Sequence, residues 1–288
     1  MIKQYKISVP KSTLNEIYKK VRNFPWSATQ NMNGWEYGTN LNYLKSISKY
    51  WITKYDWKKF ENKINSLKNY RTKVEDINLH FIFEKSKNPN SKPLLLLHGW
   101  PGSITEFLDI IPRLAHPEKY GGKIEDGFDV IVPSLPGFGF SSQIKKALGP
   151  RKIGKILNKF MVKNLGYKNY FVQGGDWGAT IAGWIGLDSS KNCKGIHINC
   201  LPLRHPKGTK NIKEKKWEKK FNFDQIMQEG YRTQQATKPQ TLSYAMIDSP
   251  VGTAAWILEK FHGWSDLKMG KIEKTFSKDE LLSNIMIY

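Results

Sequence analysis

The sequence has few cysteines and no long apolar run, and each absence narrows the class of protein. Among its 288 residues there are two cysteines, Cys193 and Cys200, which are too few for a disulfide framework and lack the spacing of a metal site. No apolar run is long enough to cross a membrane, and the first residues have no signal-peptide core. We therefore expect a cytoplasmic protein with no membrane span, no metal and no cofactor.

Arginine is also scarce, and this bears on the partners of the chain. The net charge of +21 comes from 46 basic and 25 acidic residues, a balance that is typical of nucleic-acid binding. However, the arginines are few and scattered, whereas specific readers of bases and phosphates cluster arginine on one element. The remaining positive charge is lysine spread along the whole chain. We therefore predict a solvated, lysine-rich surface and no nucleic-acid partner.

Residues 170–183 (YFVQGGDWGATIAG) are the stretch around which the rest is organised. A short β-branched and aromatic run ends at two glycines, and Gly174-x-Asp176-x-Gly178 has the form of a nucleophile elbow. We expect both glycines to be required because a Cβ there would collide with crossing backbone. Ala179 and Gly183, one helical turn apart, are expected to let the following helix lie close to the strand. A carboxylate on an elbow attacks carbon and gives an ester, which must then be hydrolysed.

The competing interpretation is an ordinary Gly-Asp turn, and the neighbouring segments argue against it. Apolar runs at 93–97, 128–132, 170–173 and 195–199 alternate with helical patterns, which predicts an α/β fold with a doubly wound, mostly parallel sheet. One helix is expected after Ser103, with Ile110 on its buried side, and another over about 151–165. Two strands around a turn at Asp76 are expected before the first run. Ligand sites in such folds lie at the carboxyl ends of the strands. Loops rich in Gly and Pro follow two of these runs, HGWPGS at 98–103 and SLPGFGFS at 134–141. Three unusual strand ends together favour a catalytic Asp176.

Residues 1–72 have a different character, with helical spacing and many aromatic rings. Ser12 or Thr13 is expected to cap the first helix, and the segment is expected to wrap the core without doing chemistry. Residues 73–200 are expected to form the first part of the α/β core. Residues 201–288 are expected to form a helical cap.

The motifs HGWPGS, SLPGFGFS and GGDWG resemble the α/β-hydrolase fold, and specifically the epoxide hydrolases of the microsomal type. Residues 34–40 (GWEYGTN) resemble the N-terminal domain that accompanies that group. Residues 237–241 (TKPQT) and the segment from Asp248 to Phe261 resemble its cap. The resemblance extends over essentially the whole chain.

This resemblance implies a role for each matching residue. Asp176 would attack a ring carbon of a small hydrophobic epoxide, and Tyr231 in the cap would give a proton to the ring oxygen. The backbone N–H groups of Trp100 and Trp177 would form the oxyanion hole when water opens the ester. The substrate would also be contacted by the loop residues His98, Gly99 and Pro101. The family's cis peptide would correspond to the bond between Trp100 and Pro101.

The chain departs from the family pattern after Asp176. The second cap tyrosine, the acid and the histidine base of the family have no match before Tyr288, so the enzyme looks C-terminally incomplete, its last strands missing. Asn199 is an amide where some relatives carry an alternative acid. The histidines after Asp176 do not match the base position; they are His197, His205 and His262.

Two other functions compete with epoxide hydrolysis. A haloalkane or haloacid dehalogenase also uses an elbow aspartate, and the indole of Trp177 could bind a halide. Tyr231 and the N-terminal segment favour the epoxide, because a halide leaves without a proton. A truncated, non-catalytic scaffold is the third interpretation, and the missing base supports it. Tyr244 and Tyr288 do not match the context of a proton donor.

Overall fold

The structure is a computed structural model that describes residues 1–30, 32, 34–200, 208 and 211–288. The chain divides into two compact units, which we call the sheet unit (Met1–Val9, Asp56–Pro202, Met286–Tyr288) and the helical unit (Pro10–Tyr55, Leu203–Ile285). The sheet unit takes up the chain again at Asp56 and not at residue 73, because helix α3 (Trp57–Asn65) and the strand after it pack with the sheet. The division after Pro202 lies next to the expected one at 200. In the described residues no helix is long and apolar enough to cross a membrane.

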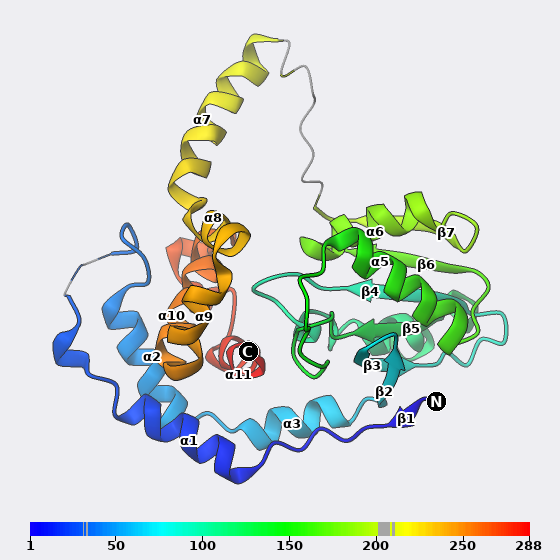
Figure 1. The fold of residues 1–288 in the computed structure, drawn as a ribbon, viewed down its shortest axis with the longest axis horizontal. Coiled ribbons are helices and arrows are strands. Elements are labelled where there is room, and N and C mark those ends of the chain that lie inside the picture. The colour runs from blue at the N-terminus through cyan, green and yellow to red at the C-terminus, as the bar shows by residue number, and fades with distance from the viewer. Residues whose placement is uncertain (31, 33, 201–207, 209–210) are drawn as a thin grey trace. The chain divides into compact units, whose positions relative to one another are not determined.

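The sheet unit contains one mixed sheet, in the order β1-β2-β3-β5-β4-β6-β7 (Figure 1). Strands β5, β4, β6 and β7 are parallel, whereas β1, β2, β3 and β5 pair antiparallel. The four predicted apolar strands are therefore confirmed. The hairpin of β2 and β3 turns at Glu75 and Asp76, as the Asp76 turn predicted. The strands are β1 (Lys3–Gln4), β2 (Asn69–Val74), β3 (Ile77–Glu84), β4 (Lys92–Leu97), β5 (Phe128–Pro133), β6 (Tyr170–Gly174) and β7 (Cys193–Ile198).

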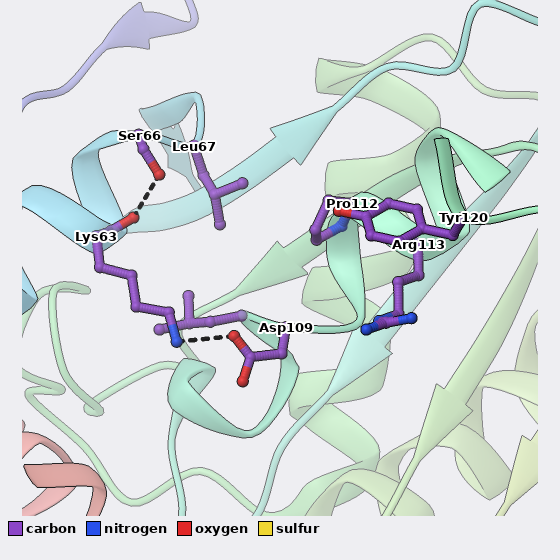
Figure 2. Close-up of a pocket in the computed structure, with 8 residues that line it drawn as sticks. Lys63, Ser66, Leu67, Asp109, Pro112, Arg113 and Tyr120 are labelled. Carbon is purple, nitrogen blue, oxygen red and sulfur yellow. Dashed lines mark hydrogen bonds and ion pairs between the residues drawn. The ribbon is translucent and has the colours of Figure 1, made fainter. Parts of the chain in front are cut away.

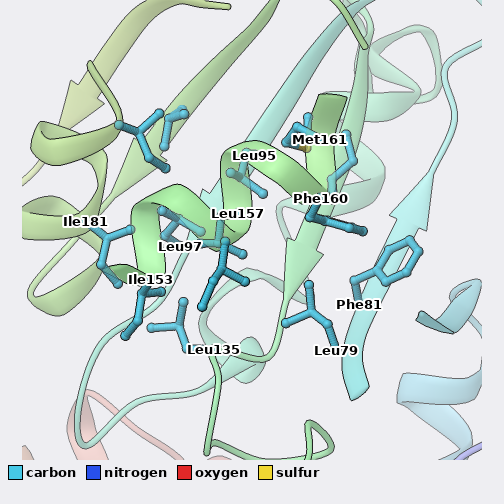
Figure 3. Close-up of a cluster of buried hydrophobic side chains, with 14 of the residues drawn as sticks. Leu79, Phe81, Leu95, Leu97, Leu135, Ile153, Leu157, Phe160, Met161 and Ile181 are labelled. Atoms are coloured by element: carbon cyan, nitrogen blue, oxygen red, sulfur yellow. The ribbon is translucent and has the colours of Figure 1, made fainter. Parts of the chain in front are cut away.

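Both faces of the sheet are buried, because successive leucines of strand β4 belong alternately to the cores on its two faces. Leu95 and Leu97 belong to one core cluster with helices α5 (Pro150–Lys159) and α6 (Trp177–Asp188). Figure 3 shows this cluster, to which Leu157 of α5 also belongs. Leu96, between them, belongs to the cluster on the opposite face, with residues of α3 and α4. The continuous apolar run thus forms a strand covered on two sides.

The helix expected after Ser103 is replaced by two short pieces. A 3-10 helix, η2 (Ile104–Phe107), is followed by α4 (Ile111–Ala115), with Pro112 in its first turn. Proline lacks an N–H and is accepted at the start of a helix but not in its interior, so a new helix begins there. Ile110, expected on the buried side, is 43% exposed. The helix expected over 151–165 is confirmed as α5 followed by a π-helical turn, η5 (Phe160–Asn164).

The helical unit is built around α10 (Pro250–Gly263), which packs against α1, α2 and α9. The expectation that Ser12 or Thr13 caps α1 is wrong: the helix begins at Lys11 after Pro10, without a side-chain cap. Helix α2 is capped by Asn40, whose side chain accepts from the N–H of Tyr43 at 2.9 Å. The helices are α1 (Lys11–Arg22), α2 (Leu41–Thr53), α7 (Ile212–Gln228), α8 (Gly230–Thr237), α9 (Pro239–Asp248), α10 and α11 (Lys278–Ile287).

Short 3-10 helices complete the described elements. One lies in the N-terminal region, two follow α4 and two precede α11. They are η1 (Trp26–Ala28), η3 (Pro117–Tyr120), η4 (Ile124–Asp126), η6 (Lys268–Gly270) and η7 (Ile272–Lys274).

Candidate active site

Asp176 stands at the sharp turn between β6 and α6, as the elbow pattern predicts. Its backbone has φ 48° and ψ −122°, a left-handed conformation that is strained for a residue with a Cβ. A Cβ on Gly174 would stand 2.2 Å from the carbonyl oxygen of Gly178, and a Cβ on Gly178 would stand 2.1 Å from that of Leu97. Both elbow glycines are therefore required by crossing backbone, and that prediction is confirmed.

Gly183 does not have the role that its spacing suggested. It is exposed on α6, and a Cβ added there would meet nothing within 4 Å. The close approach of α6 to the sheet is made instead by Gly178 and by Gly186, whose Cβ would stand 3.3 Å from the side chain of Ile196 in β7. Helical spacing identified a small residue but not the side of the helix on which it lies.

The loop 98–103 lies directly against the elbow. The N–H of Trp100 donates to Oδ1 of Asp176 at 2.9 Å. A Cβ on Gly99 would stand 2.3 Å from the same oxygen, so the loop approaches the carboxylate with bare backbone. The peptide bond between Trp100 and Pro101 is cis, as the resemblance implies. Trp177 is the first residue of α6, and its N–H belongs to a first turn that has no intrahelical acceptor.

His98, predicted to contact substrate, is fully buried beneath this loop. Its Nε2 accepts the N–H of Leu135 at 3.0 Å, so Nδ1 carries the proton and donates to the carbonyl oxygen of Gly99 at 3.1 Å. Burial lowers the pKa of His98 to about 4, so the ring is neutral. The buried ring supports the loop, and substrate contacts by His98, Gly99 and Pro101 stay a prediction.

The third predicted loop, 134–141, is tied to the other two through His98. Ser141 donates its hydroxyl to the carbonyl oxygen of Ser134 at 2.7 Å, which closes the loop on itself. The ring of Phe138 lies edge-on to that of His98, with centroids 5.3 Å apart. The three strand ends that the sequence singled out therefore meet at one place.

Two further residues at this place were missed or set aside in the sequence. The carboxyl of Glu106 fills the space beside Gly102, where an added Cβ would stand 1.7 Å from Oε1. Tyr288 donates its hydroxyl to the carbonyl oxygen of Gly102 at 2.7 Å. The four-residue spacing from Gly102 to Glu106 could have revealed the first; nothing in the sequence indicates the second.

These two groups share an unusual electrostatic environment. Glu106 is an exposed residue whose Oε1 lies beside Gly102. Desolvation, opposed by the Gly99 N–H and assisted by the charge of Asp176, raises the pKa of this carboxyl to about 7. Burial of the hydroxyl, and then the charges of Glu106 and Asp176, hold the pKa of Tyr288 well above its ordinary value.

A separate depression of about 440 Å³ lies on the sheet unit, away from this cluster of loops. Figure 2 shows Lys63 of α3 reaching Asp109 across it, with an Nζ to Oδ1 distance of 2.7 Å. Arg113 lies over the ring of Tyr120, 4.7 Å from its centroid. None of the residues that line this depression is a nucleophile on an elbow, so we assign the depression no part in the site.

Comparison with known proteins identifies the family. A model described as epoxide hydrolase N terminus matches residues 2–107, and one described as alpha/beta hydrolase fold matches residues 92–268. Epoxide hydrolase 1 of Oryctolagus cuniculus is 36% identical over 315 residues, which cover 100% of this chain and 69% of that protein. The chain belongs to the microsomal-type epoxide hydrolases.

Solved structures of epoxide hydrolases have the same fold. Juvenile hormone epoxide hydrolase from the silkworm Bombyx mori matches with a TM-score of 0.88 and 30% identity, over 100% of this chain and 73% of that one. The epoxide hydrolase of Aspergillus niger matches with a TM-score of 0.86 and 25% identity, over 100% and 74%. The chain spans 66% and 69% of the length of two curated relatives. The predicted family and fold are confirmed.

Tyr231, the proton donor that membership in the epoxide hydrolases suggests, lies in the helical unit at the start of α8. Its ring meets that of Trp264 edge-on at 4.8 Å, and Nζ of Lys260 lies 4.8 Å above it. Lys260 is buried and forms an ion pair with Glu259. These contacts hold the ring of Tyr231 in place, and its role toward an epoxide stays a prediction.

The histidines after Asp176 have varied surroundings in this epoxide hydrolase chain. His197 is exposed on β7, in register with Gln173 of β6. His262 is stacked on Trp35 in the helical unit, with centroids 3.9 Å apart. His205 lies outside the described residues. Asn199 packs against the elbow, where its Oδ1 would be 2.5 Å from a Cβ on Gly175.

Proposed function

We propose that the chain opens epoxides to vicinal diols through an ester on Asp176. The observation that carries this proposal is the elbow carboxylate at φ 48° with the Trp100 N–H 2.9 Å from its Oδ1. Oδ2 of Asp176 forms a bond to a ring carbon while the ring carbon–oxygen bond breaks. The ring oxygen takes a proton, and a glycol ester results.

The hydrogen bond from Trp100 gives the two oxygens of Asp176 different tasks. Oδ1 is held by the N–H, which leaves Oδ2 to attack. In the ester Oδ1 is the carbonyl oxygen, and it becomes an oxyanion when water adds to the carbonyl carbon. The N–H groups of Trp100 and Trp177 would then stabilise that charge, and one such donor contributes about 10²–10³-fold in kcat.

The proton for the ring oxygen is assigned to Tyr231. An epoxide oxygen leaves as an alkoxide and needs a general acid, whereas a halide leaves as an anion without one. The phenol of Tyr231 suits an epoxide and has no use in dehalogenation. Family membership supports the same choice, since the N-terminal model matched by residues 2–107 is that of epoxide hydrolases.

The second step needs a base for the attacking water. Both ring nitrogens of His80 form hydrogen bonds, one with Ser134 and one with Asn69. Both ring nitrogens of His98 also form hydrogen bonds, with Gly99 and Leu135. His116 is paired with Glu84 through Nε2. These three histidines are therefore not expected to activate the water, and the ester on Asp176 should accumulate unless His197, His205 or His262 supplies the base.

The proposal is tested by intact mass spectrometry after incubation with an aryl epoxide such as styrene oxide, followed by peptide mapping. One adduct on the peptide that contains Asp176, absent in Asp176→Ala, is the expected result. A folded protein without this adduct would refute the proposal. Repeated turnover to diol would show that the chain supplies its own base. Chloride release from a chloroalkane, with no reaction of the epoxide, would favour the dehalogenase.

A further inference from the structure

A buried lysine lies beside the tyrosine to which the proton of the ring oxygen is assigned. Lys260, in the last turn of α10, is 4% exposed. Its Nζ lies 4.8 Å from the centroid of the Tyr231 ring and 5.5 Å from that of the Trp264 ring. Lysine is seldom buried unless its charge is paired, so the groups around this ammonium decide what it does.

The surroundings hold the ammonium over the ring of Tyr231. Trp264, the residue after α10, donates its backbone N–H to the carbonyl oxygen of Lys260 at 2.9 Å. The rings of Trp264 and Tyr231 meet edge-on, with centroids 4.8 Å apart. Nζ of Lys260 also pairs with Oε2 of Glu259 at 2.5 Å, which offsets part of the cost of burying the ammonium. Lysine, tryptophan and tyrosine therefore form one packed cluster within the helical unit.

We propose that Lys260 is a positioning residue that makes Tyr231 a better proton donor. When Tyr231 gives its proton to the ring oxygen of the epoxide, the phenol becomes a phenolate, whose negative charge is shared between its oxygen and its ring. The ammonium over the ring stabilises that charge, and the phenolate afterwards takes a proton back from solvent. This inference rests on the role of Tyr231 in the proposed function.

The distance between the ammonium and the ring is short enough for this effect. An opposite charge within about 4–6 Å favours the ionised form of an acid, and Nζ of Lys260 lies 4.8 Å from the ring centroid. A cation over the face of a neutral tyrosine ring is already attracted by it. The attraction grows as the ring gains negative charge. Lys260 therefore favours the transition state, in which the proton has partly moved, over the neutral phenol.

A purely structural role for Lys260 is the competing interpretation. A lysine in the last turn of a helix interacts favourably with the helix dipole, and its stem adds packing. Under that interpretation, any change that weakens the cluster also slows the reaction. The electrostatic role instead predicts opposite effects for the two charges, because the carboxylate of Glu259 opposes the ammonium with which it pairs.

Other charged groups near the cluster are the same in every variant compared below. Glu229 and Arg232, on either side of Tyr231 in the sequence, form an exposed ion pair at 3.3 Å. His262 follows Lys260 on α10. Burial lowers the pKa of His262 and the charge of Glu259 opposes this, so the ring of His262 is neutral at the alkaline pH at which a tyrosine titrates.

The first test requires no epoxide. Protein labelled with ¹³C at the tyrosine Cζ atoms is titrated by NMR, and the resonance of Tyr231 is assigned by its loss in Tyr231→Phe. In Lys260→Met, which keeps an unbranched stem and removes the charge, the midpoint of Tyr231 should rise. In Glu259→Gln, which leaves the ammonium unbalanced, it should fall.

The opposite signs decide the first test. Midpoints that stay unchanged, or that move in the same direction in both variants, would overturn the proposal. The side chain of Glu259 is 23% exposed, so Glu259→Gln is the milder change. If Lys260→Met does not fold, a midpoint that stays or rises in Glu259→Gln would still overturn the proposal.

The second test measures the rate of adduct formation on Asp176 with styrene oxide. Lys260→Met should slow it about three- to tenfold, because one opposite charge changes an acid constant about tenfold or more and a partial proton transfer transmits only part of this. Lys260→Arg keeps a charge that can lie over the ring and should keep most of the rate. In Tyr231→Phe, which has no proton to give, Lys260→Met should leave the remaining rate unchanged.

A matched control lysine lies in the same unit. Nζ of Lys278 lies 5.6 Å from the centroid of the Tyr50 ring and 3.8 Å from Oε1 of Glu273. Lys278→Met removes the same kinds of contact from a tyrosine to which no part in the reaction is assigned. It should leave both the midpoint of Tyr231 and the rate as in the wild type. A slowing equal to that of Lys260→Met would contradict the proposal.

The outcomes separate this inference from the proposed function. A slowing by Lys260→Met that persists in Tyr231→Phe overturns the action of Lys260 through the hydroxyl and leaves it a structural residue. An adduct that fails to form in the wild type refutes the ester on Asp176 instead. In that case the NMR titration still decides whether Lys260 stabilises the phenolate of Tyr231.

Discussion

Leu135 donates its backbone N–H to Nε2 of His98 over 3.0 Å, and this bond joins two loops that lie 37 residues apart in sequence. The bond requires a neutral ring, because a protonated imidazole has no acceptor. The positions of the loops that surround Asp176 therefore depend on the protonation state of a side chain that is fully buried.

Acid should destabilise the sheet unit through His98. The pKa of His98 is lowered from 6.5 to about 4 by burial, so below about pH 6.5 the unfolded chain binds a proton that the folded chain does not. Stability contributed by the neutral ring is present above pH 6.5 and is lost as the pH falls toward 4. His98→Gln keeps an acceptor for Leu135 and cannot titrate in this range.

Urea unfolding at about pH 7.5 and about pH 4.5, on either side of the unfolded-state value of 6.5, is the measurement. His98→Gln should be less stable than the wild type at the higher pH, because it loses ring packing, but should lose less on acidification. Burial also lowers the pKa of His80, to about 3, so His80 contributes to the loss of stability in acid. This contribution is the same in both proteins and cancels when their losses are compared. Equal losses in the two proteins would contradict the prediction.

The two glycines of the elbow helix should respond oppositely to alanine. Gly178→Ala places a Cβ 2.1 Å from the carbonyl oxygen of Leu97, which is backbone and cannot move aside. We expect a loss of about 3 kcal/mol or more in unfolding free energy, or no folded protein. Gly183→Ala, with nothing within 4 Å, should stabilise α6 by up to about 1 kcal/mol. Thermal unfolding checks both, and equal effects would refute the elbow geometry.

Tyr231→Phe should slow the alkylation of Asp176 without unfolding the protein. The edge-on contact of its ring with Trp264 is kept, and only the hydroxyl is lost. A general acid contributes about 10²–10⁴-fold, so the rate of adduct formation should fall within that range. Tyr244→Phe is the control, because Tyr244 is 65% exposed and should not affect the rate. An unchanged rate in Tyr231→Phe would exclude the role.

Tyr288→Phe should weaken the loop that holds Trp100. The hydroxyl donates to the carbonyl oxygen of Gly102 at 2.7 Å, and such a bond contributes about 1 kcal/mol. Because the pKa of Tyr288 lies well above its ordinary value, the loss in unfolding free energy should be the same at pH values from neutral to mildly alkaline. Tyr120→Phe, at a residue 48% exposed on the same unit, serves as the control. A pH-dependent loss would argue against this interpretation.

The lysine-rich charge should not give specific nucleic-acid binding. Binding of duplex DNA, followed by fluorescence anisotropy, should be weak and should disappear at physiological salt. Tight binding that resists salt would contradict the prediction that the net charge of +21 is a solvated surface.

The parts of the site that sequence could predict are those defined by local backbone. Gly174 and Gly178 were predictable because a tight strand-to-helix turn brings its own backbone onto the glycines. The position of the loop 98–103 followed from a buried parallel strand, whose end has a known place in the sheet. Family resemblance then supplied roles that spacing alone left open.

The remaining features depend on contacts between distant segments or on competing local rules. Tyr288 reaches Gly102 across 186 residues, and no local pattern carries that information. The prediction of one helix after Ser103 is wrong because a new helix starts at Pro112, and hydrophobic periodicity does not reveal such a start. The prediction for Gly183 is wrong because spacing along a helix does not reveal which of its sides packs against the sheet.

The central position of β4 has a consequence for the order in which the protein loosens. This strand pairs with β5 on one side and β6 on the other, and both of its faces are buried. Its amides should exchange with deuterium only through global opening, whereas those of the edge strands β1 and β7 exchange through local opening. The loop that holds Trp100 follows β4, and the elbow follows β6. The reactive geometry is thus anchored in the slowest-exchanging part of the sheet, and it should outlast the fraying of both edges.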